Sequence, residues 1–172
     1  MLLQRRRLLL AVPAVPLALA GCGSAVVQSL PTVAAALQAI ESLATGWRST
    51  GAWSLAQILN HAAQSIEYSM SGFPESKSAL FRATLGSAAF ALFDARGAMS
   101  HSLNEPIPGA PALAATDALP AAIARALAAL RAFEAHRGAL SPHFAYGTLD
   151  KAQYTRAHLM HLANHWSELI RA

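Results

Sequence analysis

Residues 150–165 read DKAQYTRAHLMHLANH, a run without proline or glycine that predicts a long helix. Asp150 followed three positions later by Gln153 is the pattern of a capping box, so we expect the helix to begin there and to run nearly to Ala172. Positions three, four and seven apart share one face of a helix. One face therefore carries Tyr154, His158, His161, Leu162, His165 and Leu169. The opposite face carries Arg156, Met160 and Ser167.

The chain before this stretch contains start and stop signals for further helices. A second capping box at Ser54 and Gln57, prolines suited to a first turn and glycines after apolar runs mark their ends. The expected helices cover residues 31–44, 54–70, 74–96 and 117–137. The proline-rich residues 101–116 predict an irregular connection. With no alternating strand pattern and no repeat, the sequence predicts an all-α fold, an antiparallel four-helix bundle core with about five helices.

Composition narrows the class of protein. The chain has 172 residues, 54% of them hydrophobic and 13% charged, which is enough to bury a core and excludes a disordered protein. Three of the thirteen cations are Arg5, Arg6 and Arg7, and without them ten cations face nine anions. Since nucleic-acid binding needs clustered cations and no basic stripe remains, we exclude a nucleic-acid partner.

The N-terminus has the layout of a secretory signal. A charged start and an apolar stretch over residues 8–20 lead to Leu19-Ala20-Gly21-Cys22, which resembles a bacterial lipoprotein cleavage box. We expect residues 1–21 to be a lipoprotein signal peptide, 22–30 a tether and 31–172 the domain, with Cys22 lipidated. The alternative, a membrane-spanning anchor, needs about 20 apolar residues, and this stretch is shorter and contains two prolines.

The start of that segment also indicates an export route. Arg5-Arg6-Arg7-Leu8-Leu9 is similar to a twin-arginine signal, although Gln4 stands where that signal usually has Ser or Thr, so the general secretory route stays an alternative. We expect a protein on the periplasmic side of the cell envelope, anchored to the membrane by lipid. Its partners are then the export machinery and the lipoprotein-processing enzymes, and a homodimer is allowed. With a single cysteine, disulfides play no part within the chain.

The histidines of the last helix indicate a metal site. His161 and His165, at i and i+4, have Cβ atoms about 5–6 Å apart, so two ring nitrogens can meet on one ion at about 2.0–2.1 Å. The alternative is that they are core histidines satisfied by polar neighbours. Burying an unpaired polar ring costs roughly 1–3 kcal/mol, and the polar partners nearby are few: Tyr154, Asn164 and Glu168. A metal ion satisfies several rings at once, which favours the metal.

A third ligand must come from another element. His61 lies at the edge of the apolar stripe of the second expected helix, beside Ser65 and Tyr68. By pattern alone it can turn inward or face solvent. The remaining histidines have no helical partner, and we interpret them as ordinary loop or surface residues: His101, His136 and His143.

Several motifs in order resemble one family. They are Trp53-Ser54, QILNH at 57–61, SIEYS at 65–69, IPGAP at 107–111, PHFAYGTL at 142–149 and HLMHLANH at 158–165. Together they resemble the DinB-like superfamily, and within it a branch catalogued as domain of unknown function 1569. The resemblance implies a four-helix bundle with a divalent metal on His61, His161 and His165. The branch often has His-His where this chain has Asn164-His165, and His158 becomes a candidate for contacting a ligand or the substrate.

Two functions follow as hypotheses. Three imidazoles leave coordination positions open, which suits a reactive metal, with zinc the default and nickel, iron or manganese also accepted. The first hypothesis is a metal-dependent hydrolase or transferase, since members of the superfamily include thiol-dependent S-transferases. Its candidate catalytic residues are Tyr68, Tyr154, His158 and Glu168. The second is a non-catalytic periplasmic protein that binds metal or a small ligand. A structural bundle with a vestigial site is a third, blander alternative.

Overall fold

The structure, a computed structural model, describes residues 29–172, so the expected signal peptide and Cys22 lie outside the described residues. The described part is mostly helical, with one small sheet. In chain order its elements are α1 (Val33–Ser42), β1 (Trp47–Ser49), α2 (Leu55–Ser71), α3 (Ala79–Phe81), the π-helical turn η1 (Arg82–Gly86), α4 (Ser87–Arg96), α5 (Leu119–Ala135), α6 (Lys151–Trp166) and β2 (Leu169–Arg171). No helix in this part is both long and apolar enough to cross a bilayer.

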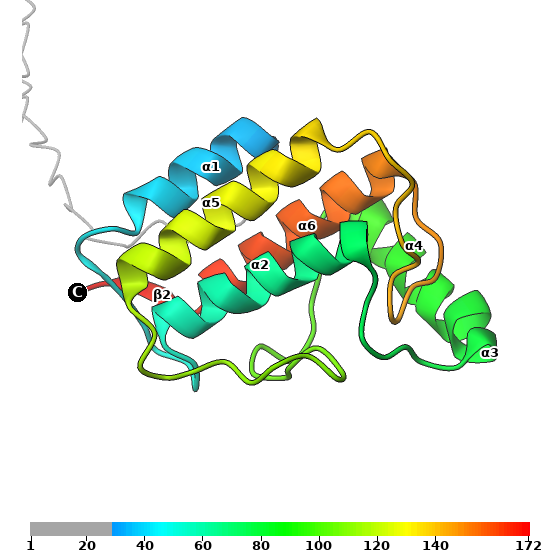
Figure 1. The fold of residues 1–172 in the computed structure, drawn as a ribbon, viewed down its shortest axis with the longest axis horizontal. Coiled ribbons are helices and arrows are strands. Elements are labelled where there is room, and N and C mark those ends of the chain that lie inside the picture. Colours follow the sequence, from blue (N-terminus) through cyan, green and yellow to red (C-terminus); the bar gives the residue numbers. More distant parts are fainter. Residues whose placement is uncertain (1–28) are drawn as a thin grey trace, which may run out of the picture.

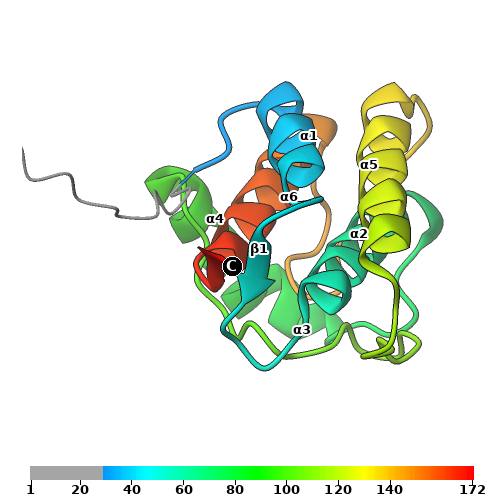
Figure 2. The same ribbon diagram turned by 90° about the vertical axis from the view of Figure 1, so that its left-hand side faces the viewer.

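Four helices lie side by side around the main core. In the view of Figure 2, α1 and α6 lie on one side and α5 and α2 on the other, while α3 and α4 lie beside α6 (Figure 1). Fully buried side chains from each of the four helices meet between them, for example Ile40, Ile58, Leu130 and Leu162. Because α2 contacts both α5 and α6, nearly all of its residues from Leu55 to Ile66 are buried.

Both expected capping boxes are confirmed. The Ser54 hydroxyl accepts the Gln57 amide N–H at 3.2 Å, and the Gln57 side-chain oxygen accepts the Ser54 N–H at 2.9 Å. Asp150 and Gln153 make the same two bonds at 2.7 and 2.9 Å. These bonds fix the first residues of α2 and α6 and thereby set which side chains of each helix face the other.

The end of the chain differs from the expectation. α6 ends at Trp166, and Leu169–Arg171 pairs antiparallel with Trp47–Ser49. The prediction of a helix running nearly to Ala172 was therefore wrong, and a two-stranded sheet joins a fold expected to be all-α. Leu169 is buried in the core, and the Arg171 guanidinium lies 4.3 Å from the Trp47 ring. Three-residue strands are too short to show alternation in a sequence. Met160, expected on the outer face of α6, is also buried.

The third helix also begins later than expected. The Lys77 N–H donates to the Phe144 carbonyl at 2.9 Å, which holds this segment in an extended conformation, and the helix begins only after Ser78. The helix continues through a π-helical turn that brings Gly86 against the loop before α6. A Cβ at Gly86 would lie 1.9 Å from the Ala145 carbonyl oxygen, so only glycine allows this close approach.

The connection over residues 97–118 has no regular structure, as expected, but side chains of α2 hold it in place. Gln57 and Gln64 each donate a side-chain N–H to backbone carbonyls of the connection at 3.1 Å, and Asn60 donates to Asp117 at 2.8 Å. The connection therefore lies along α2 and covers the face from which His61 projects.

Candidate metal centre

Three histidines from two helices meet in the interior. His61 comes from α2, and His161 and His165 lie one turn apart on α6; one ring nitrogen of each lies within 4.8 Å of the others. The Nε2 atoms of His161 and His165 are 3.1 Å apart. Two nitrogens bound to one zinc at 2.0–2.1 Å in a tetrahedron are about 3.4 Å apart. The spacing thus matches a shared ion, and these three side chains could hold one.

The rings are not satisfied by polar neighbours. His61 is 4% exposed and His165 is fully buried, while His161 is half-buried because it lines a cavity. The Nδ1 atoms of His61 and His165 have no hydrogen-bond partner among residues 29–172. Ordinary core histidines would require such partners, so these rings do not form a satisfied polar core. The facing Nε2 atoms of His161 and His165 are the pair that an ion would share.

Burial keeps these imidazoles neutral. It lowers the pKa of His61 to about 4 and that of His165 to about 3, and it places the pKa of His161 well below its usual value. Neighbouring imidazoles add a smaller effect in the same direction. Because a metal binds neutral imidazole, the three lone pairs are available at neutral pH.

One side of the cluster is closed by an aromatic side chain. The Trp53 indole lies 4.9 Å from the His61 ring and stacks against His165, with centroids 6.2 Å apart and planes 15° apart. This large apolar surface keeps water from that side, which strengthens electrostatic interactions with an ion at the cluster. An ion or ligand would therefore reach the histidines from the opposite side.

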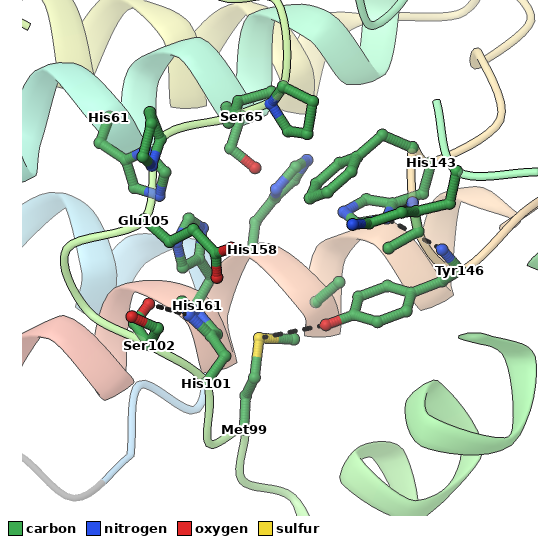
Figure 3. A pocket seen from close by; sticks show the side chains of 17 residues that line it. His61, Ser65, Met99, His101, Ser102, Glu105, His143, Tyr146, His158 and His161 are labelled. Carbon is green, nitrogen blue, oxygen red and sulfur yellow. Dashed lines mark hydrogen bonds between the residues drawn. The ribbon is translucent and has the colours of Figure 1, made fainter. Parts of the chain in front are cut away.

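Two histidines of the cluster, His61 and His161, line a cavity of about 240 Å³. His61, His101 and His161 gather at one end, His143 and Tyr146 lie at the other, and His158 lies between the two groups (Figure 3). The walls come from α2, α6, the connection over residues 97–118 and the loop before α6. The cluster thus opens, through His61 and His161, onto a space that can hold a small molecule, while His165 stays buried behind them.

A comparison with protein families identifies the class of chain. The family model described as "Protein of unknown function (DUF1569)" matches residues 28–172. The chain belongs to this family. Neither the curated proteins nor the solved structures gave a significant match. The resemblance to this branch is therefore confirmed, and the wider link to the DinB-like superfamily stays a prediction.

Of the four candidate catalytic residues in this DUF1569 chain, His158 lies in the cavity wall. Its Nε2 is 3.2 Å from the Ser69 hydroxyl, which itself donates to the Ile66 carbonyl at 2.6 Å. The imidazole must then donate from Nε2, which leaves Nδ1 as an acceptor. Burial lowers the pKa of His158 to about 3, so the ring is neutral.

The other three candidates are not among the residues that line the cavity. The buried Tyr154 donates its hydroxyl to the Ser141 carbonyl at 2.7 Å, and burial raises the pKa of its phenol. Tyr68 packs against Phe73, with ring centroids 5.8 Å apart. Glu168 lies beside Gly51 near the paired strands. These positions favour a packing role for each.

Three residues of the cavity wall could not be predicted from the sequence: His101, Glu105 and His143. His143 is 7% exposed, its Nδ1 accepts the N–H groups of Ala145 and Tyr146, and its ring stacks on Tyr146 at 4.3 Å. His101 lies beside the three-histidine cluster, and Glu105 also lines the cavity. His101 and His143 lie in loops, as expected, but they are not ordinary surface residues, because both line the cavity and His143 is buried. All three lie in irregular segments, where helical spacing gives no signal.

Proposed function

We propose that this DUF1569 protein is a DinB-like metal protein that binds one divalent ion, zinc first among the candidates, through His61, His161 and His165. The observation that carries the proposal is the convergence of three ring nitrogens within 4.8 Å at the end of a cavity. The side-by-side packing of α1, α2, α5 and α6 supports the four-helix bundle that the superfamily implies. One histidine lies on α2 and two lie on α6, and this distribution supports the link to the DinB-like superfamily.

We infer further that the bound metal acts on a small molecule in the cavity, as a hydrolase or transferase. Three imidazoles leave a coordination position that faces the cavity. A metal in such a site activates water or polarises a carbonyl or phosphoryl group. The cavity of about 240 Å³ is smaller than most ligand pockets, which favours a small substrate.

Glu105 is the proposed proton acceptor of this reaction. It is the one acidic residue among the described residues that line the cavity. Glu67 and Glu41, which lie on the helices, pair instead with Arg125 and Arg131 at 2.7 and 3.0 Å. A carboxylate on the cavity wall can take a proton from a nucleophile held beside it.

The test separates metal binding from turnover. Metal content of freshly purified protein is measured first, and the metal-loaded protein is then screened against esters, amides and phosphoesters. His161→Ala is expected to lose both metal and turnover while its circular dichroism stays unchanged. Glu105→Gln is expected to keep the metal and to lose about 10²-fold in kcat/KM. Turnover that persists in both variants would reject this metal-dependent mechanism, and absence of turnover in the metal-loaded unaltered protein across the screen would count against the enzyme hypothesis.

A second candidate function is binding of metal or a small ligand without turnover. The placement of the carboxylates favours it, because the single acidic side chain in the described cavity wall is the exposed Glu105. Calorimetry of the metal-loaded protein would distinguish it from an enzyme. A panel compound that binds and is recovered unchanged would establish this function.

We also propose that the chain is exported and lipidated at Cys22, on the periplasmic side of the membrane. The support is the signal-like sequence before Cys22, the one cysteine of the chain. Fractionation of cells that express the full chain tests this proposal. The unaltered protein is expected in the membrane fraction, released by detergent, and Cys22→Ala is expected to lack the lipid by mass spectrometry. Recovery of the unaltered chain in the cytosol with its N-terminus intact would contradict both export and lipidation.

A further inference from the structure

His101 stands beside the three-histidine cluster although it comes from the irregular connection. Its ring centroid is 5.0 Å from that of His161 and 5.7 Å from that of His165. The three clustered rings are themselves 4.9–5.2 Å apart. The distances from His101 to His161 and His165 are therefore close to the distances within the cluster itself. His101 lies on the cavity side of the cluster (Figure 3).

The hydrogen bond made by His101 leaves its Nε2 atom available to bind a metal ion. Its Nδ1 is 2.7 Å from the Ser102 carbonyl oxygen, which can only accept, so Nδ1 carries the proton. The lone pair is then on Nε2. Histidines that bind metals in proteins usually donate their other ring N–H to a carbonyl or carboxylate in this way. The His101 ring is thus in the tautomer that a metal ligand requires.

The backbone around His101 is held against the bundle. Met99 and Ile107 on either side of it are buried, and the later part of the connection is hydrogen-bonded to α2 through Gln57 and Gln64. The ligand nitrogens of His61, His161 and His165 lie within 4.8 Å of one another, and the nitrogens of His101 lie outside this group. A small shift of residues 100–102 toward His161 would bring Nε2 into that group, and Ser100 and Ser102 are exposed and can accommodate it.

We propose that His101 supplies a fourth imidazole ligand on the cavity side of the metal. This inference rests on the three-histidine metal site of the proposed function. With His101 bound, four neutral imidazoles complete a tetrahedral site. Because His101 comes from the irregular connection and the other three are held by helices, it is the ligand that an oxygen or nitrogen donor of a substrate replaces.

The test uses the full chain loaded with cobalt(II), whose visible spectrum reports the ligands and their geometry. His101→Ala is expected to bind one cobalt ion about 10- to 100-fold more weakly by chelator competition, with shifted visible bands. Added imidazole is expected to restore the original spectrum, because it can enter the cavity. His136→Ala, on the surface at the end of α5, is the matched control and is expected to behave as the unaltered protein.

The outcomes separate this inference from the one it rests on. Identical spectra and affinities for His101→Ala and the unaltered protein would overturn the fourth ligand and leave the three-histidine site intact. Failure of the unaltered protein to bind cobalt or zinc would overturn both. X-ray absorption of the zinc-loaded protein gives a second readout, with four imidazoles expected in the unaltered chain and three in His101→Ala. Should His101→Ala misfold, His101→Gln provides the same comparison with less change in volume.

Discussion

Replacing His165 by alanine is expected to reduce zinc affinity about 10³-fold, because structural zinc sites bind with roughly 10–16 kcal/mol shared among three or four ligands. His165 is fully buried, and its Nε2 faces that of His161 at 3.1 Å. Without His165, α6 offers the ion only His161, and α2 offers only His61. The site is then reduced to one imidazole from each helix. Chelator competition measures the affinity, and thermal unfolding with added zinc checks it independently. The zinc-induced rise in Tm is expected to disappear.

The control for His165→Ala must separate a lost ligand from a hole in the core. His165→Gln keeps most of the volume beside Trp53 but offers no imidazole, so it is expected to lose zinc while unfolding closer to the unaltered protein. His136→Ala again tests for a general effect of removing a histidine. Zinc affinity that survives in both His165 variants would mean that the ion binds elsewhere.

Acid is expected to unfold the metal-free protein over an unusually high pH range. Burial lowers the pKa of His61 to about 4 and those of His143, His158 and His165 to about 3, and it lowers that of His161 strongly. In the unfolded chain these rings titrate near 6.5. Between these values the unfolded chain binds more protons, so stability is fully present above pH 6.5 and is lost as the pH falls. In this range each buried imidazole lowers the free energy of unfolding by about 1 kcal/mol for each unit by which the pH falls.

The size of this effect can be measured by urea unfolding with chelator between pH 5 and 8. A domain of this size has a total stability of roughly 5–15 kcal/mol, so several such histidines acting together are expected to unfold the metal-free protein near pH 5. His158→Gln is expected to reduce the slope by about one proton, with His136→Gln as the surface control. Saturating zinc is expected to shift the loss of folding stability to lower pH, because an imidazole bound to zinc resists protonation. Stability that stays constant from pH 7 to pH 5.5 would contradict the neutral, buried state of these rings.

The parts of the site that follow helical spacing could be predicted from sequence. The capping box at Asp150 fixes the start of α6, and the i, i+4 relation then places His161 and His165 together. His61 could not be placed by spacing, because its burial depends on α6 and on the connection that covers α2. The resemblance to known motifs supplied that ligand, and the structure places it at the cluster.

The parts that depend on long-range contacts could not be predicted. The position of His101 is set by hydrogen bonds from α2 to residues far along the connection, and that of His143 by the turn that Gly147 closes. The third helix begins after the backbone hydrogen bond between Lys77 and Phe144, although Pro74 would suit an earlier start. None of these contacts leaves a local pattern in the sequence.

The positions of the ligands along the chain have a mechanical consequence. His61 and His161 are 100 residues apart, and the chain has one cysteine, so no disulfide can close this loop. An ion shared by the two side chains would act as a cross-link between α2 and α6. By the loop-entropy relation, a covalent link that closes about 100 residues restricts the unfolded chain by roughly 4–5 kcal/mol. A metal cross-link would give the bundle a comparable restraint that reducing agents do not break and that chelators remove.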